Sequence, residues 1–381
     1  MSLKPRPQVV VIGGGFAGLE VAERLSGEPV DVLLLDRNPY TTFQPLLYQV
    51  ATGGLNPGDV THSLRALCAR HPNVRFRQAD VTGLDLEGRS VATSGGPISY
   101  DWLVVACGAV ANHFGVEGAA EHSLTIYTRG DSLEVRDRVF GRLEIEAQRP
   151  TAEHPTIVVV GGGPTGVELA GMFAEMRDAL PSAYPEIDPA RLRVVLVEMS
   201  EAVLGAFSSR VSDYTAHELT DRGVELRLGS AVASVAADHV VLDSGERIDS
   251  VATIWASGVK GHEMLADWGL PTGRGGRVEI GSDLRVVGYD EVFAAGDAAV
   301  NPDDPLPQLA QPAIQGGRHV ADEILRSMRG GATEGFRYVD KGTMATIGRA
   351  DAVIEFPNGR TITGFVAWVG WVALHEPAEP R

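Results

Sequence analysis

Two glycine-rich segments have the residue types and the spacing that hold a dinucleotide. Each follows an apolar run and opens a helical pattern, and each has a carboxylate further along the chain, about 20 residues on in the first segment. In such a turn the first glycine makes the bend, the second lets the backbone approach a pyrophosphate, and the third packs the helix on the strand. The helix N-terminus attracts the phosphates, and the carboxylate accepts hydrogen bonds from a ribose. The residues are Gly13, Gly15, Gly18 and Asp36 in the first segment, and Gly161, Gly163, Gly166 and Glu198 in the second.

The two segments are copies of one unit. VVVIGGGFAGLE, from Val9, aligns without a gap with IVVVGGGPTGVE, from Ile157, and each is followed by a helical pattern and a short apolar strand that ends in the acid. This order predicts a βαβ unit. A single such motif also occurs as a plain tight turn, but two complete copies at corresponding positions favour two dinucleotide sites. A reaction between two bound dinucleotides implies a flavin at one site and a nicotinamide at the other.

Glu198 bears on the choice of nicotinamide. A carboxylate at this position accepts from a 2′-hydroxyl but repels a 2′-phosphate, by roughly 3 kcal/mol at about 6 Å and an effective dielectric constant near ~20. Met199 and Ser200 follow it, so no arginine stands there to bind a phosphate. The sequence therefore predicts NADH rather than NADPH.

The cysteines restrict what can accept the electrons. Only Cys68 and Cys107 occur, far apart in the sequence, so there is no disulfide framework, zinc spacing or CxxC redox pair. Electrons must then leave a flavin for an acceptor that needs no protein thiol, which is a quinone, a small redox protein or oxygen. No metal site is predicted.

The composition fits a globular α/β protein of two domains. The chain has 381 residues, 44% of them apolar, and 45 glycines. Its net charge of −17 argues against nucleic acid as a partner and against non-specific adhesion to anionic lipid. The first residues lack the apolar core of a secretory signal, and no apolar run reaches the roughly 20 residues of a membrane-spanning helix. We therefore expect a cytoplasmic protein.

Longer strings resemble one family, the type II NADH dehydrogenases, which are NADH:quinone oxidoreductases that pump no protons. The likeness covers nearly the whole chain. It implies an α/β fold with two Rossmann-like domains, FAD and NADH as cofactors, a quinone as substrate, and a flavin lying against FQPLLYQVATG. The strings are DRNPYTTFQPLLYQVATGGL from Asp36, GGGPTGVELAG from Gly161, AAGDAA from Ala294, AQPAIQGG from Ala310, KGTMATIGRADAV from Lys341 and GFVAWVGWVALH from Gly364.

The same resemblance assigns the cofactors to the domains. In the wider group of flavoproteins with two dinucleotides, a late Gly-Asp turn closes over FAD, and DEVFAAGDAA from Asp290 resembles it, although Gly-Asp is also a common turn. FAD is thus expected in residues 1–115 and 270–340, NADH in an inserted domain of residues 116–269, and residues 341–381 form a short C-terminal segment. The further predicted cofactor-binding residues are Arg37, Gly108, Asp297 and Ala298.

Gln311 and Gln315 are the candidate quinone contacts. They stand four residues apart and share one face of a predicted helix, and Gly316 and Gly317 beside them let a flat ligand or a backbone approach. Amide groups suit quinone oxygens, and the resemblance puts the quinone head group at this helix. The alternative is an ordinary solvated polar face.

Glu168 and Lys341 are the other predicted catalytic residues. Glu168 lies in the first turn of a helix, where a carboxylate often only stabilises the helix dipole, and Glu20 occupies the same place in the first copy. In the resembled family, the matching acid lies between nicotinamide, flavin and quinone, with the matching lysine close by. The resemblance therefore implies that both residues place the nicotinamide and relay protons.

The C-terminal region departs from the resembled family. Its members continue beyond the position of His375 into amphipathic segments that dock on a membrane, whereas this sequence stops at EPAEPR. Phe365, Trp368 and Val372 form a short apolar stripe there, expected to be core or interfacial. The sequence leaves open a weak peripheral contact with the cytoplasmic face of a membrane, a homodimer, and two rival functions: an NADH-dependent reductase of a small redox protein, and an FAD- and NADH-binding redox sensor.

Overall fold

The structure is a computed structural model that describes residues 6–149 and 154–375. The chain forms two compact units. The first consists of Met1–Thr42, Thr61–Val110 and Val259–Asp340, and the second of Phe43–Val60, Ala111–Gly258 and Lys341–Arg381. The chain therefore crosses between the units five times, and each unit is assembled from separated stretches of sequence.

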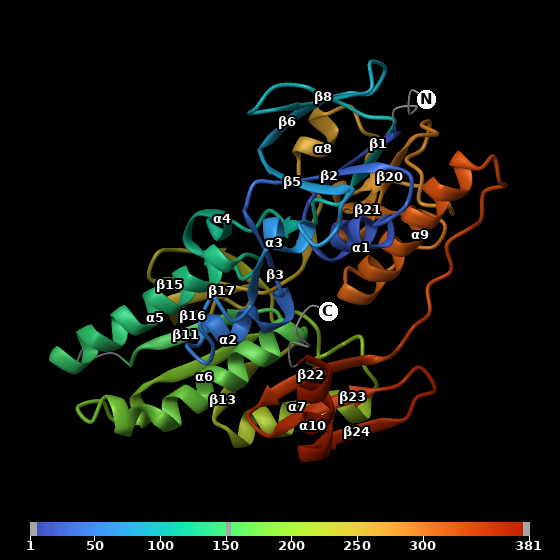
Figure 1. Cartoon of the computed structure of the whole chain (residues 1–381). Coiled ribbons are helices and arrows are strands. Elements are labelled where there is room, and N and C mark those ends of the chain that lie inside the picture. The colour runs from blue at the N-terminus through green and yellow to red at the C-terminus, as the bar shows by residue number, and fades with distance from the viewer. Residues whose placement is uncertain (1–5, 150–153, 376–381) are drawn as a thin grey trace. The chain divides into compact units, whose positions relative to one another are not determined.

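The first unit is built on a five-stranded sheet in the order β20-β9-β1-β2-β5, with parallel pairing throughout. Val10 in its central strand pairs with Leu33 on one side and Leu103 on the other, and it is fully buried, as expected for a parallel sheet covered on both faces. Figure 1 shows β1, β2, β5 and β20 side by side although β20 comes from late in the chain. The strands are β1 (Gln8–Ile12), β2 (Asp31–Asp36), β5 (Val74–Gln78), β9 (Trp102–Val105) and β20 (Val292–Ala294).

Helices and small sheets complete the first unit. Its two longer helices, α1 (Phe16–Arg24) and α9 (Ala310–Met328), pack against each other. The shorter elements are β3 (Tyr40–Thr42), β4 (Thr61–Ser63), α3 (Leu64–Cys68), β6 (Val81–Asp85), β7 (Ser90–Thr93), β8 (Ile98–Ser99), α8 (Met264–Asp267), η3 (Arg274–Gly276), β19 (Val278–Glu279), η4 (Gly296–Ala298) and β21 (Ala299–Val300). The short strands β10 (Val110–Ala111) and β18 (Val259–Lys260) stand at crossings between the units.

The second unit repeats this plan. Its parallel sheet has the order β13-β12-β11-β17, which corresponds to β5-β2-β1-β9 of the first unit. In both units a three-stranded antiparallel sheet is inserted in the sequence between the third and fourth of these parallel strands. The antiparallel sheets are β6-β7-β8 and β14-β15-β16. The strands are β11 (Thr156–Val160), β12 (Arg193–Val197), β13 (Val224–Arg227), β14 (Val232–Val235), β15 (His239–Leu242), β16 (Arg247–Asp249) and β17 (Ala252–Trp255).

Helices from three parts of the chain cover the second unit. α5 starts at a capping box in which Thr128 and Asp131 exchange hydrogen bonds. The elements are η1 (Gln44–Leu46), α2 (Leu47–Ala51), α4 (Ala119–His122), α5 (Arg129–Gln148), α6 (Pro164–Ala183), η2 (Pro189–Arg191), α7 (Ser209–Asp221), β22 (Thr343–Gly348), β23 (Asp351–Glu355), β24 (Thr361–Gly364) and α10 (Phe365–His375).

This architecture confirms the predicted fold class of two Rossmann-like α/β units with parallel sheets. Within residues 6–149 and 154–375, no helix has the length and apolar character needed to cross a membrane. α10, the most apolar of the helices, has 11 residues.

Candidate functional site

The first glycine of each turn makes a bend that no other residue fits. Gly13 and Gly161 have φ angles of +105° and +109°. A Cβ added to Gly13 would lie 2.2 Å from the carbonyl oxygen of Ala106, and one added to Gly161 would lie 2.9 Å from that of Ala256. Each glycine amide also donates to the strand that ends in the acid, Gly13 to Leu35 and Gly161 to Val197, both at 2.8 Å.

The third glycine of each turn allows close packing of the helix, and the second leaves space for a ligand. A Cβ at Gly18 would lie 1.9 Å from the oxygen of Gly13, and one at Gly166 would lie 1.8 Å from that of Gly161, so both let the helix close on the turn. A Cβ at Gly15 or Gly163 would meet no atom of the described residues within 4 Å. Each turn therefore leaves open space at the helix N-terminus, where a pyrophosphate fits.

The carboxylates Asp36 and Glu198 are held in matching ways. Asp36 accepts from the amides of Gly14 and Asn38, both at 2.7 Å. Glu198 accepts from Gly162 at 2.6 Å and Ser200 at 2.7 Å. Burial raises the pKa of Asp36 above its ordinary value, although the two backbone hydrogen bonds oppose this shift. Both carboxylates are thus fixed beside their turns and keep lone pairs for ribose hydroxyls.

The remaining predicted cofactor residues of the first unit lie at the ends of its strands and turns. Arg37 is exposed beside Asp36, and Gly108, with a φ of +73°, follows β9. Asp297 and Ala298 form η4 just after β20, and the Asp297 carbonyl accepts from the Gln308 side chain at 3.1 Å. These positions follow the carboxyl ends of parallel strands, where α/β sheets bind ligands.

Glu168 lies in a very different environment from its counterpart in the first copy. Glu20 pairs with Arg318 of α9. Glu168 is buried in the second unit and accepts from the Thr346 amide of β22 at 3.4 Å. Burial raises the pKa of Glu168 from 4.5 to about 8. A carboxyl in this setting holds a proton near neutral pH, which is the property of a general acid.

Two residues not singled out by the sequence complete the surroundings of Glu168. The Tyr48 and Thr346 hydroxyls are 2.9 Å apart, and the Gln49 amide donates to Tyr48 at 3.0 Å. Burial, and secondarily the charge of Glu168, raises the pKa of Tyr48 above its ordinary value. The available signal was that Tyr48 belongs to the FQPLLYQVATG string and Thr346 to KGTMATIGR, two strings of the resembled family.

Gly171 explains how Thr346 reaches Glu168. A Cβ at Gly171 would lie 1.9 Å from the carbonyl oxygen of Ile347, so only glycine lets β22 pack this closely on α6. Lys341 does not share this position. It is exposed and precedes Thr346 by five residues, or roughly 16 Å of extended chain.

Helix α9 carries the predicted glutamines in the first unit. Gln311 and Gln315 are both half-buried, and Gln315 donates to Gln311 Oε1 at 3.4 Å. The neighbouring glycines serve helix packing: a Cβ at Gly317 would lie 2.4 Å from the carbonyl oxygen of Ala17 in α1, and Gly316 is buried beside Leu284. The close backbone approach expected there is that of α1.

Known proteins match the chain over most of its length. The sequence profile of the pyridine nucleotide-disulphide oxidoreductase family matches residues 7–317. The type II NADH:quinone oxidoreductase Ndh of Mycobacterium tuberculosis is 36% identical over 97% of this chain and 84% of that protein. The type II NADH:quinone oxidoreductase of Staphylococcus haemolyticus is 30% identical over 94% and 92%.

The chain belongs to the type II NADH:quinone oxidoreductase family. The resemblance of its sequence strings to that family is thereby confirmed. Among solved structures, NDH2 from Plasmodium falciparum in complex with NADH superposes with a TM-score of 0.89 at 19% identity, covering 97% of this chain and 94% of that one, which supports the same fold.

The cysteines of this family member differ from those implied by the wider family's name. Cys68 and Cys107 are both free. Burial raises the pKa of both thiols, and that of Cys107 reaches about 12. Neither has the lowered pKa of a reactive thiolate, so neither is suited to a dithiol redox step.

Proposed function

We propose that this protein is an NADH:quinone oxidoreductase that uses FAD as its bound flavin. Family membership supports the reaction, and the two open glycine turns with their fixed carboxylates support two dinucleotide sites. The overall reaction converts NADH, quinone and one proton to NAD⁺ and quinol, and FAD, when bound, would supply the two-electron redox chemistry between the two substrates. The protein's own groups bind, orient and supply protons.

The first unit binds FAD and the second binds NADH in this proposal. The late turn that contains Asp297 belongs to the first unit, which supports FAD there. In the second unit, Glu198 accepts from a 2′-hydroxyl of the adenosine ribose and repels a 2′-phosphate. The open space at Gly15 and Gly163 admits the pyrophosphate in each case.

Glu168 is the proposed proton donor. Its raised pKa of about 8, caused by burial, keeps it protonated near pH 7. Tyr48 and Thr346 form a short hydrogen-bonded pair beside it, which supports a path for returning the proton after transfer. Lys341, exposed at the start of the C-terminal segment, is proposed only to attract the negative nicotinamide cofactor.

Gln311 is the proposed contact for the quinone oxygen. Its amide nitrogen is a neutral hydrogen-bond donor in the N-terminal turn of α9. Both the donor and the positive end of the helix dipole stabilise the negative charge that develops on a quinone as it is reduced. Because the quinones of this reaction are apolar, a weak peripheral membrane contact is also proposed. The exposed apolar side chains of α10, such as Phe365 at 61% and Val366 at 67%, support it.

Stopped-flow kinetics of the two half-reactions test the proposal. NADH should reduce the bound flavin, and a soluble short-chain quinone should reoxidise it. Gln311→Leu should slow only reoxidation, several-fold, because it removes the donor without touching the nicotinamide site. If reduced wild-type flavin reacts with no quinone but reduces a small redox protein, the acceptor assignment is wrong.

A further inference from the structure

The segment after α9, residues 331–340, is held against that helix, and we name it the strap. It contains no regular secondary structure and appears as the long irregular orange segment in Figure 1. α9 and the strap both belong to the first unit. A contact between the strap and α9 can therefore affect how Gln311 and Gln315 of α9 are oriented.

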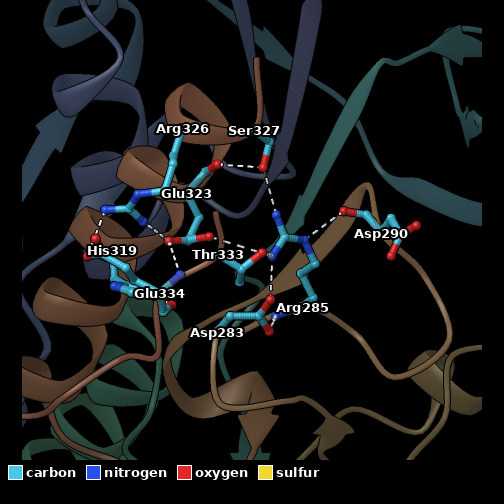
Figure 2. A network of polar contacts seen from close by, with 9 residues as sticks. All are labelled: Asp283, Arg285, Asp290, His319, Glu323, Arg326, Ser327, Thr333 and Glu334. Atoms are coloured by element: carbon cyan, nitrogen blue, oxygen red, sulfur yellow. Dashed lines mark hydrogen bonds and ion pairs between the residues drawn. The ribbon is translucent and has the colours of Figure 1, made fainter. Parts of the chain in front are cut away.

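A buried carboxylate pins the first half of the strap, as Figure 2 shows. Glu323 of α9 is fully buried and accepts from the Glu334 amide at 3.1 Å. Arg326 bridges to the Glu334 carboxylate at 2.8 Å, and His319 lies 3.1 Å from the Glu334 carbonyl oxygen. These contacts fix both the backbone and the side chain of Glu334 on α9.

Arg285 ties the start of the strap to the rest of the unit. It donates to Ser327 at 2.7 Å and to Thr333 at 3.3 Å, and it pairs with Asp283 (Figure 2). Further along, the Phe336 amide donates to the Ser282 carbonyl at 2.6 Å. The strap is therefore anchored at several points before it reaches Val339.

The side-chain amide of Gln315 forms two hydrogen bonds with the backbone of Val339 in the strap. Its Oε1 accepts from the Val339 amide at 3.0 Å, and its Nε2 donates to the Val339 carbonyl at 3.0 Å. Rotation of the terminal amide of a glutamine side chain can exchange the positions of its nitrogen and its oxygen, whereas the N–H and C=O groups of a backbone residue cannot exchange places. The Val339 peptide therefore decides which way the Gln315 amide faces.

The same choice is passed on to Gln311. Gln315 Nε2 also donates to Gln311 Oε1, with 3.4 Å between the nitrogen and the oxygen. Both Gln315 protons are then used within the protein, so Gln315 has no donor left for a ligand. Gln311 must turn its oxygen toward Gln315, and among the described residues its own Nε2 has no acceptor.

We propose that Gln315 is a positioning residue: anchored by the Val339 peptide of the strap, it orients the Gln311 amide so that Gln311 Nε2 faces the electron acceptor. This inference rests on the proposed quinone site at Gln311. It divides the glutamine pair into one residue that touches the acceptor and one that acts only through its neighbour.

A double-mutant cycle separates positioning from direct contact. Gln311→Leu and Gln315→Leu should each raise the KM for a short-chain quinone by about fivefold, and the double variant should be no worse than Gln311→Leu alone. Gln315→Glu should have an effect similar to Gln315→Leu, because a carboxylate there draws Gln311 Nε2 inward. Flavin content and reduction by NADH should stay unchanged in every variant.

The strap supplies an independent test. Val339→Pro removes the amide that Gln315 Oε1 accepts from, so it should raise the same KM as Gln315→Leu does. Arg337→Gln, at an exposed strap residue, is the matched control and should leave it unchanged.

The outcomes distinguish this inference from the proposed function. A double variant several-fold worse than Gln311→Leu would show that Gln315 contacts the acceptor itself, and an ineffective Gln315→Leu beside an effective Gln311→Leu would overturn the positioning role. Either result leaves the quinone site standing. If Gln311→Leu has no effect on the KM, the acceptor site proposed on α9 is wrong as well.

Discussion

At the scale of single residues, the buried carboxyl of Glu168 should make stability depend on pH. Its pKa of about 8 in the folded state, raised by burial, exceeds the ordinary 4.5 of the unfolded chain. Between these values the folded state holds a proton that the unfolded state lacks. The stability contribution is therefore present at low pH and is lost as pH rises toward 8.

Glu168→Gln, which cannot ionise, should remove that dependence. Between about pH 5.5 and 8 the free energy of unfolding of the wild type should fall by on the order of 3 kcal/mol more than that of the variant, as measured by denaturant titration. Glu186→Gln, at an exposed position, is the control and should follow the wild type. Parallel curves for wild type and Glu168→Gln would contradict the burial of this charge.

Glu198 should set the preference for NADH. The rate of flavin reduction should be much higher with NADH than with NADPH, and Glu198→Gln should narrow the gap because it removes repulsion of about 3 kcal/mol or less. Glu201→Gln, a nearby exposed glutamate, should leave the ratio of kcat/KM values unchanged. Equal rates of the wild type with both cofactors would disprove the role of Glu198.

The sequence predicts some residue environments and misses others. The hydrogen bonds of Asp36 and Glu198 match because both are made inside the repeated unit. Glu20 and Glu168 occupy equivalent positions but differ, because their neighbours arrive from α9 and β22, which the repeat does not include. Local patterns cannot tell which distant segment packs on a position.

At the scale of elements, the close packing of β22 on α6 should depend on Gly171. A Cβ there would lie 1.9 Å from a backbone oxygen of β22, so Gly171→Ala must push the strand away from the helix. We expect a loss of about 2 kcal/mol in the free energy of unfolding and a shift of the Glu168 titration as Thr346 withdraws.

Gly141→Ala in α5 is the matched control. A Cβ at Gly141 meets no described atom within 4 Å, so this change should be neutral or stabilise the helix by up to about 1 kcal/mol. If Gly171→Ala is equally harmless, the contact between α6 and β22 is looser than described.

The elements that could be predicted are those with a strong local signature. Glycine turns, apolar strands and terminal acids identify both βαβ units. Residues 43–60 carry no comparable signature for their place, since their short helix α2 joins α5 and α6 of the second unit through tertiary packing alone. The grip of Gln315 on the strap depends on a peptide 24 residues away and is likewise invisible in the local pattern.

At the scale of the whole molecule, we propose that two similar units bind two different cofactors, so the proposed reaction depends on keeping their roles separate. Each unit has its own sheet, its own open turn and its own carboxylate. Damage to one turn should therefore remove one cofactor and spare the other. Duplication also explains why the sequence predicts the fold well: the second copy tests the interpretation of the first.

The two second-position glycines allow that separation to be measured. Gly15 and Gly163 have ordinary negative φ angles of −83° and −71°, and an added Cβ meets no described atom within 4 Å, so valine fits the folded protein at either site. The space that valine fills is the space a pyrophosphate needs.

Gly15→Val should give a folded protein that releases no FAD on heating, whereas Gly163→Val should release a full equivalent of FAD. In Gly163→Val, NADH should reduce that flavin at least tenfold more slowly at limiting concentration, while dithionite reduces it normally and a quinone reoxidises it at the wild-type rate. Full FAD content in Gly15→Val would refute the assignment of FAD to the first unit, and loss of FAD in Gly163→Val would reverse the assignment of the two cofactors.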